Sequence, residues 1–145
     1  MSRSAHSRYE AVAERLHSTA IHLLRRVRVQ DAASGISPAR LSALSVIVFG
    51  GPISLRDLAK AEQVRPPTMS RIVDALEAGG LARRKVNARD RRGVTIEATG
   101  KGVTLLQEGR RRRVKLLARD LAGLSPAELT GIESSLRAIQ KILTG

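Results

Sequence analysis

The stretch from residue 54 to residue 99 limits the possible folds more than any other part of this chain. Ser54 can cap a short helix, a polar turn follows, and Pro66 and Pro67 then fit only the first turn of a second helix, where missing amide donors cost little. A pair of glycines ends that helix at residues 79–80. Two short, partly β-branched segments come next. The order predicts a helix, a turn, a second helix and a β-hairpin.

Amphipathic helices are predicted on both sides of this stretch. Apolar residues recur at helical spacing from Ala13 to Val27, in a helix that could run to about residue 30, and Ser37, followed by a proline, opens a further helix. After the hairpin, Thr99 can cap a long helix, and Ser125 begins the capping box of the last one. Residues 1 to about 8 are small, polar and basic, and we expect them to form a loose tail.

These elements predict a mainly α-helical protein with a small β-hairpin wing, in which a winged helix-turn-helix lobe joins a helical dimerisation region. The expected boundaries are 1–36 for an N-terminal dimerisation helix, 37–99 for the lobe and 100–145 for two C-terminal dimerisation helices. Apolar stripes outside the lobe are longer than so small a unit can cover. The stripe of the last helix comprises Leu129, Ile132, Leu136, Ile139 and Leu143. A two-fold homodimer would cover such stripes and would supply a pair of DNA-reading units for a palindromic DNA site.

The composition favours a polyanionic partner. Lys and Arg number 26 against 13 Asp and Glu, which gives a formal net charge of +13. Such a charge suits nucleic acid or an acidic membrane surface. Tyr9 and Phe49 are the only aromatic residues in the sequence, which argues against binders that stack single-stranded bases on aromatic side chains. Double-stranded DNA is therefore the better-fitting partner.

Several other classes find little support in the sequence. The longest unbroken apolar run, residues 46–49, is too short to cross a bilayer, so we expect a cytoplasmic protein with no membrane partner. Without cysteine there is neither a disulfide nor a thiolate metal site. Glu10, Glu14 and His17 share a helix face and could hold a cation, but exposed helices commonly carry this pattern. No catalytic pattern stands out, so we expect neither an enzyme, nor a metal, nor a cofactor.

The second helix of the central stretch carries the candidate base-reading residues. A helix in the major groove reads bases with side chains near its N-terminus, while its opposite face anchors the core. The outward positions are Arg65, Pro67, Thr68, Ser70 and Arg71. Arg71 could bind a guanine through two hydrogen bonds, and Thr68 and Ser70 could touch base edges or phosphates. The alternative interpretation is that these side chains form only a solvated helix face.

The hairpin carries a dense group of basic residues. Between residues 83 and 92 the only acid is Asp90, and the basic residues are Arg83, Arg84, Lys85, Arg89, Arg91 and Arg92. We expect Arg84, Arg89, Arg91 and Arg92 to contact DNA, because an arginine on a narrow projection can enter the minor groove. Asp90 is expected to orient a neighbouring arginine through a salt bridge.

The chain resembles the MarR family of bacterial transcription regulators. The resemblance rests on the stretch from Val64 to Leu76, the Gly80-Leu81 pair, the Asp90-Arg91-Arg92 triplet and residues 99–102. The wing pattern of aspartate and arginine, followed by a strand and a threonine-led helix, is its more specific part. Ala98 departs from the family, which usually has a leucine before the threonine, and the departure bears on the packing of the wing.

The resemblance implies a triangular homodimer that binds a pseudo-palindromic operator, usually as a repressor. It also implies that the recognition helix enters the major groove and that a wing arginine enters the minor groove. In this sequence, these roles are carried over to Thr68, Ser70 and Arg71 in the helix and to Arg92 in the wing.

Members of the family often bind small aromatic carboxylates in a cleft between the dimerisation region and the lobe. The candidates for lining such a cleft here are His17, His22 and Arg25, together with one or two of the arginines at 110–113. An effector of this class is therefore an expectation that rests on the resemblance.

Two other classes of function remain open at this point. A non-specific architectural protein would coat DNA with the same salt sensitivity but without preference among sequences. A peripheral membrane or partner-binding protein is supported only by the basic amphipathic first helix.

Overall fold

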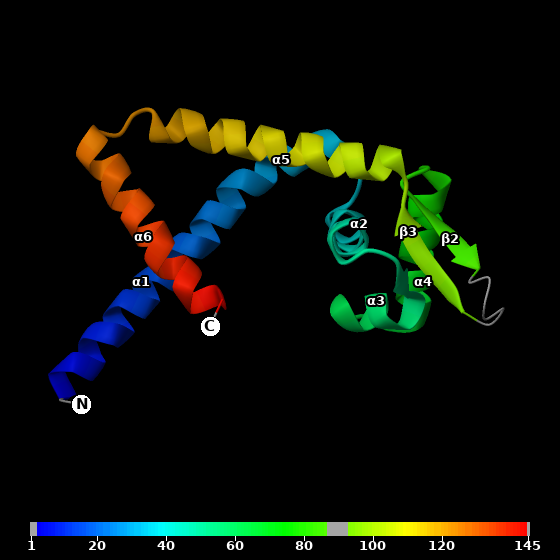
Figure 1. Ribbon diagram of the computed structural model, residues 1–145, viewed down its shortest axis with the longest axis horizontal. Helices are drawn as coiled ribbons and strands as arrows, with labels where there is room; N and C mark the ends of the chain where they lie inside the picture. Colours follow the sequence, from blue (N-terminus) through cyan, green and yellow to red (C-terminus); the bar gives the residue numbers. More distant parts are fainter. Residues whose placement is uncertain (1–2, 87–92, 145) are drawn as a thin grey trace.

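The computed structural model describes residues 3–86 and 93–144 and shows a mostly helical chain with one small antiparallel sheet (Figure 1). The helices are α1 (Arg3–Arg28), the 3-10 helix η1 (Val29–Ser34), α2 (Pro38–Gly50), α3 (Leu55–Ala61), α4 (Pro66–Ala78), α5 (Gly100–Leu121) and α6 (Pro126–Thr144). The strands are β1 (Ile53–Ser54), β2 (Ala82–Val86) and β3 (Val94–Ala98). The predicted fold class, mainly α-helical with a small hairpin, is confirmed.

The N-terminal segment is more helical than predicted. Because α1 begins at Arg3, the prediction of a loose tail is wrong for residues 3–8, while residues 1–2 lie outside the described part of the chain. No proline or glycine interrupts residues 3–8, and His6 Nε2 lies 3.2 Å from Glu10 Oε1, one helical turn further on. A helix already formed over the following residues extends backwards at low cost, because only its nucleation is expensive.

The break after the first helix is a 3-10 turn. The sequence predicted a helix to about Gln30 and a break between Asp31 and Gly35. The α-helix ends two residues earlier, at Arg28, and η1 fills the expected break. Gly35 ends η1 with φ of 74°, a left-handed conformation that favours glycine.

Serine and threonine caps begin four helices at the predicted positions. Each cap hydroxyl accepts a hydrogen bond from the amide three residues later: Ser37 from Arg40 (3.4 Å), Ser54 from Asp57 (3.1 Å), Thr99 from Gly102 (3.1 Å) and Ser125 from Glu128 (3.3 Å). At α6 the capping box is complete, because the Ser125 amide donates to Glu128 Oε2 at 2.8 Å. This backbone hydrogen bond, with a second from the Ser125 hydroxyl, lowers the pKa of Glu128.

The sheet contains a strand that the sequence did not predict. Its order is β1-β3-β2, and both pairings are antiparallel. Ile96 at the centre of β3 pairs with Ile53 on one side and Arg84 on the other. β1 has only two residues, too few for a period-two pattern to be visible. It forms because β3 has amide and carbonyl groups on both edges that need partners.

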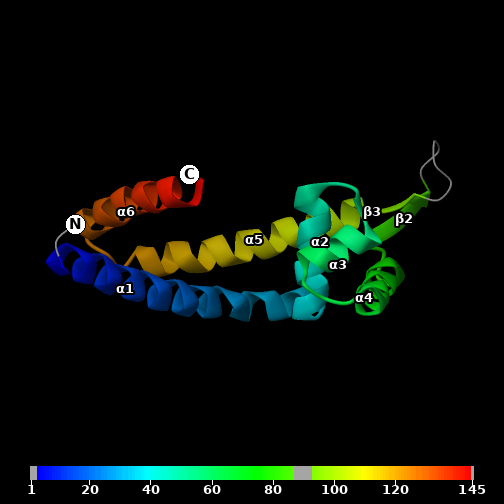
Figure 2. The ribbon, with the colours of Figure 1, turned by 90° about the horizontal axis from the view of Figure 1, so that it is seen from below.

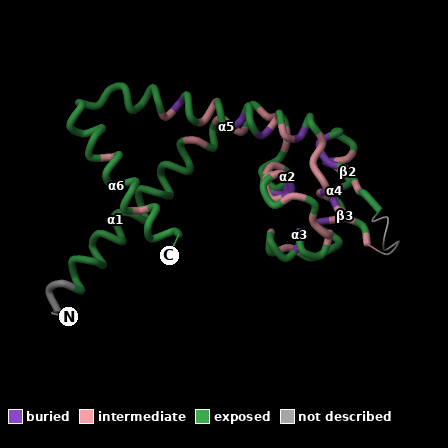
Figure 3. The backbone as a smooth tube through the Cα atoms, viewed as in Figure 1, coloured by how far each residue is buried: buried purple, intermediate pink, exposed green. Residues whose placement is uncertain are grey.

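The hydrophobic core lies within the lobe built by α2, α3, α4 and the sheet. The largest fully buried side chains are Leu44, Ile47, Leu58, Met69, Val73, Leu76 and Ile96. Leu106 of α5 joins the same core. Figure 3 shows this concentration of buried residues in the lobe, whereas α1 and α6 are exposed over almost their whole length.

The first turn of α5 is joined closely to the lobe where β3 ends. The Thr99 hydroxyl donates to the carbonyl oxygen of Gly80 at 2.6 Å, and the Thr99 amide donates to that of Leu81 at 3.0 Å. Gly102 is buried beside the same backbone. From this joint α5 runs out of the lobe, and α6 turns back from its far end (Figure 2).

Two ion pairs connect the N-terminal helices to α5. Arg113 contacts Asp31 of η1, and both side chains are partly buried. Arg26 of α1 donates from Nε and Nη2 to the two carboxylate oxygens of Asp120, at 3.1 and 3.0 Å. The hydrogen bonds from Arg26 lower the pKa of Asp120, so this exposed pair remains ionised down to more acidic pH than an isolated carboxylate would.

Among the described residues, no single helix is both long and apolar enough to span a bilayer. The segments 6–34 and 38–50 together reach the necessary length and composition, but they meet at a bend of 93°.

We predict that Gly102→Ala destabilises the protein by roughly 1–3 kcal/mol, the usual cost of overfilling a packed site. A Cβ at this position would overlap the Leu81 carbonyl oxygen and would lie 3.1 Å from Leu44 Cδ1. Urea unfolding measures the effect. The matched control is Gly100→Ala in the same helix turn, where a Cβ meets nothing within 4 Å. Equal stability of the two variants would contradict the close contact at Gly102.

Candidate nucleic-acid interface

The helix α4 presents three different faces. Met69, Val73 and Leu76 are fully buried in the core. Pro67, Thr68 and Arg71, named in advance as outward positions, are exposed on the side away from the core. Arg65, the residue that precedes the helix, is exposed as well.

The third face of α4 is turned towards strand β2. It carries Ser70, Asp74 and Glu77, which follow one another at spacings of four and three residues and therefore lie along one side of the helix. Ser70 is half-buried there and accepts a hydrogen bond from Arg84 Nη2 at 3.4 Å. The structure therefore places Ser70 at the edge of the outward face, beside the wing strand.

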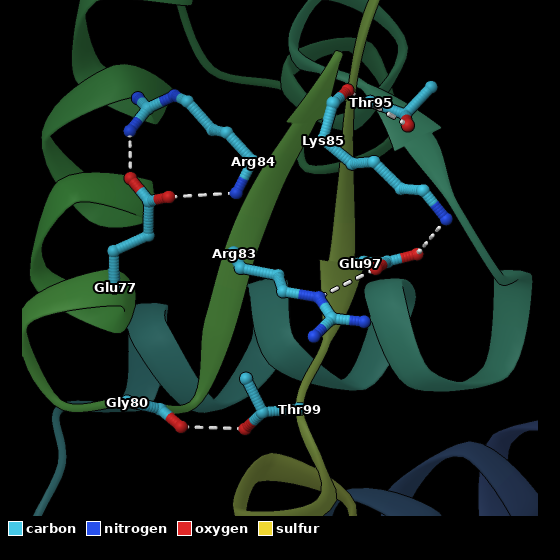
Figure 4. A network of polar contacts seen from close by, with 8 residues as sticks. All are labelled: Glu77, Gly80, Arg83, Arg84, Lys85, Thr95, Glu97 and Thr99. Atoms are coloured by element: carbon cyan, nitrogen blue, oxygen red, sulfur yellow. Dashed lines mark hydrogen bonds and ion pairs between the residues drawn. The ribbon is translucent and has the colours of Figure 1, made fainter. Parts of the chain in front are cut away.

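Arg84 on β2 joins this third face through two acids. Its Nη2 lies 2.8 Å from Asp74 Oδ1. Its Nη1 contacts Glu77 Oε2, and its backbone amide donates to Glu77 Oε1 at 2.7 Å (Figure 4). Burial lowers the pKa of Arg84, but the hydrogen bonds and charges of Asp74 and Glu77 outweigh it and raise the pKa overall. Arg84, predicted to contact DNA, is engaged with these acids in the structure.

The neighbouring basic residues of β2 lie on the opposite side of the strand. Side chains alternate along a strand, so Arg83 and Lys85 point away from α4 and share Glu97 of β3. Arg83 Nε lies 2.6 Å from Glu97 Oε1, and Lys85 Nζ lies 4.0 Å from Oε2 (Figure 4). Both cations remain about two-thirds exposed, so solvent screening leaves these pairs weak.

The tip of the wing, residues 87–92, lies outside the described residues. The predictions for Arg89, Asp90, Arg91 and Arg92 fall on this segment and stay predictions. The described strands lead towards it, with Val86 and Val94 paired as the last rung of the hairpin.

The expected ligand-lining residues of α1 do not gather at a hollow. His17, His22 and Arg25 are all exposed, and His22 Nδ1 lies 2.7 Å from the backbone carbonyl oxygen of Ser18. Within residues 3–86 and 93–144, no three His, Asp or Glu side chains are placed to hold a metal ion together, and this includes Glu10, Glu14 and His17.

A hollow of about 290 Å³ does exist between η1 and α5. Its lining includes Ser34 of η1 and Lys101, Glu108 and Arg112 of α5. Arg112 Nε is buried and has no hydrogen-bond partner within the described part of the chain. Lys101 Nζ donates to the carbonyl oxygen of Gly79, the residue that caps the C-terminus of α4, at 2.8 Å.

Sequence reasoning did not identify Asp74, Glu77 and Lys101 as parts of the site. Asp74 and Glu77 could have been found, because with Ser70 they form one side of a predicted helix. Their partner Arg84 could not be identified, because the rotation of α4 relative to β2 decides which basic residue meets them.

Comparisons with known proteins identify relatives of the sequence and of the fold. Residues 34–93 match the model of the MarR family. An uncharacterised HTH-type transcriptional regulator of Mycobacterium bovis is 32% identical over 117 residues, covering 81% of this chain and 82% of its own length. The HTH-type transcriptional repressor MdtR of Bacillus subtilis is 28% identical over 95 residues, covering 66% of this chain and 61% of its own.

Solved structures share the fold over nearly the whole chain. The transcriptional regulator Tm0710 from Thermotoga maritima superposes with a TM-score of 0.83 at 23% identity, covering 93% of this chain and 95% of its own. A MarR family protein from Bacillus stearothermophilus gives a TM-score of 0.74 at 26% identity, covering 100% and 99%. A MepR mutant from S. aureus bound to an oligodeoxyribonucleotide gives 0.71 at 20% identity, covering 91% and 97%.

We predict that Arg71→Ala relaxes base preference and weakens binding to the preferred duplex by about 1–3 kcal/mol, as expected when a bidentate contact to a base is lost. Titration of the variant against the preferred duplex and single-base variants of it measures both effects. Arg137→Ala, an exposed arginine on α6, is the control for loss of one positive charge. If Arg71→Ala keeps the full preference, the outward face of α4 is not the reading surface.

Proposed function

Because the chain belongs to the MarR family of transcription regulators, which bind DNA, we propose that it is a cytoplasmic repressor that binds a pseudo-palindromic operator as a homodimer. The observation that carries this proposal is the exposed face of α4, with Thr68 and Arg71, beside a basic hairpin on a chain of net charge +13. The assignment as a repressor is supported by the relative in Bacillus subtilis that bears that name.

In this proposal the outward residues of α4 read the major groove and the wing tip enters the minor groove. Arg71 contacts a base edge, Thr68 contacts a base edge or a phosphate, and Arg65 and Pro67 line the entry of the helix. Arg89, Arg91 and Arg92 supply the wing contacts, with Asp90 orienting one of them. Ser70 lies at the edge of this face, where it accepts a hydrogen bond from Arg84.

Exposed apolar residues outside the lobe support the homodimer. In α6, which has no buried residue, Leu136, Ile142 and Leu143 are 52%, 73% and 78% exposed. In α1, Val12 and Leu23 are exposed as well. A monomer would leave this apolar surface in water, and a second copy with interleaved helices would bury it. Two lobes held at a fixed separation also match the symmetry of a palindromic site.

The hollow between η1 and α5 supports an effector of the expected class, a small aromatic carboxylate. Arg112, whose buried Nε–H has no partner among the described residues, lines this hollow together with the positively charged Lys101. Lys101 also binds the Gly79 carbonyl at the end of α4. A carboxylate that draws Lys101 away would therefore loosen the C-terminal end of the recognition helix. In this version of the proposal, Lys101 and Arg112 replace His17, His22 and Arg25 as the anion-binding residues.

The alternative function is non-specific, architectural DNA binding. It is compatible with the same charge and predicts the same salt dependence, but it gives no role to the polar outward face of α4. Sequence preference decides between the two functions.

We predict that selection from a random duplex pool at about 150 mM salt, where phosphate contacts are weakened, enriches one palindrome. Its half-sites should lie about one helical turn apart, because the two lobes of a symmetric dimer meet the same face of the duplex. Sequencing of the bound fraction gives the result. Binding without enrichment would favour the architectural alternative, and enrichment of a single half-site would contradict the symmetric dimer.

For the effector, we predict that salicylate or benzoate binds the wild-type protein and lowers its affinity for the selected operator. Isothermal calorimetry measures binding, and operator titration measures release. Arg112→Gln is expected to abolish the heat, whereas Arg119→Gln, an exposed position of α5 that does not line the hollow, should retain it. If neither acid produces heat or changes operator affinity in the wild type, the effector proposal is wrong for this class.

A further inference from the structure

Strand β2 of the wing is bonded to the recognition helix α4 through one residue, Arg84. One arginine, Arg84, reaches Asp74 and Glu77, which lie one turn apart on α4, and also Ser70 a turn earlier. The backbone amide of Arg84 adds a bond of 2.7 Å to Glu77. Both the main chain and the side chain of the strand are thus tied to the helix.

The charge of this group is unusual for a surface next to DNA. One arginine and two carboxylates carry a net charge of −1, in a chain whose net charge is +13. The Arg84 side chain is 31% exposed, while Asp74 is 60% exposed. To neutralise a phosphate, Arg84 would have to give up charge-assisted hydrogen bonds with two acids and leave them facing the negative duplex. Direct contact between Arg84 and a phosphate is therefore energetically unfavourable.

We propose that Arg84 is a positioning residue, which fixes the wing against the recognition helix through Asp74 and Glu77 so that both reach their grooves in register. The proposal rests on the proposed reading of DNA by α4 and the wing, and it replaces the direct DNA contact that the sequence suggested for Arg84.

The geometry explains why an arginine is needed. Its planar guanidinium carries donors on separate nitrogens, so it can hold two carboxylates one helical turn apart at the same time. A lysine has the same charge but only a single nitrogen, and it would hold one acid at a time. Because Ser70, Asp74 and Glu77 occupy one side of α4, the arginine limits rotation of the helix about its axis. That rotation sets the direction in which Thr68 and Arg71 point.

Four single variants test the proposal: Arg84→Lys, Arg84→Gln, Glu77→Gln and the control Arg83→Gln. Arg83 is the adjacent residue on the same strand, faces away from α4 and loses the same charge. Affinity for the selected operator and for a scrambled duplex is measured over a series of salt concentrations. Thermal unfolding of each variant confirms that it is folded, and Arg84→Lys keeps the assay informative if Arg84→Gln is unstable.

We expect Arg84→Lys and Arg84→Gln each to lower operator affinity about tenfold relative to the scrambled duplex. The slope of log affinity against log salt should stay the same, because no phosphate contact is lost. Glu77→Gln should also weaken operator binding, although it removes a negative charge near DNA. Arg83→Gln should change the ratio of operator to scrambled affinity less than about twofold.

A phosphate contact at Arg84 would give a different pattern and overturn the proposal. Arg84→Lys would then keep most of its affinity, Arg84→Gln would reduce the salt slope by about one, and Glu77→Gln would strengthen binding. A purely structural role would lower the unfolding temperature without changing the ratio of operator to scrambled affinity, and this result would also overturn it.

Hydrogen exchange without DNA separates this proposal from the proposed function. The Arg84 amide, bonded to Glu77 Oε1, should exchange faster in Glu77→Ala, which removes both acceptor oxygens, than in the wild type, whether or not an operator exists. Faster exchange combined with no enriched sequence would mean that the proposed function fails while the contact between wing and helix stands. Unchanged exchange would overturn the contact itself.

Discussion

The joint between the hairpin and α5 holds the rest of the structure in place. There the chain leaves β3 at Thr99, whose hydroxyl and amide bind the carbonyl oxygens of Gly80 and Leu81, just after the recognition helix ends. One short segment therefore connects the end of α4, the start of β2 and the first turn of α5. Gly102 permits this approach because it has no side chain to keep α5 away from the Leu81 backbone. The direction of the long helix is thereby tied to the position of the DNA-reading lobe.

Some arginines of the lobe pair with acids inside the lobe, whereas others lie exposed on its surface. Arg84 and Arg83 lie next to each other in sequence, yet one is bound to acids on α4 and the other to Glu97 within the sheet. Arg71 lies on the exposed outward face of α4. A count of basic residues overstates the charge available to a nucleic acid, because acids within the lobe neutralise part of the charge of the arginines that they pair with. The outward face of α4 and the wing tip are then the main candidates for contact.

Two ion pairs contribute to the connection between the lobe and the flanking helices. Asp31 and Arg113 join η1 to α5, and Arg26 and Asp120 join α1 to α5 further out. The outer pair is exposed and therefore screened by salt, whereas the inner pair is partly buried. The core itself lies in the lobe, and Leu106 of α5 joins it. This arrangement suits the proposed homodimer, whose two lobes would have to match the spacing of a DNA site.

The sequence by itself determined the starts of α2, α3, α5 and α6, the recognition helix with its two leading prolines, and the hairpin, because caps, prolines and glycines act on residues within one turn of themselves. It also determined the excess of positive charge and the outward position of Arg71. Only the tertiary structure decided that Ile53 pairs with Ile96 in a third strand and that Arg84 binds Asp74 and Glu77. The strand pairing and the ion pairs both join segments that are separated along the chain. The packing of α4 and the sheet therefore selects the partners, which no local sequence pattern could predict.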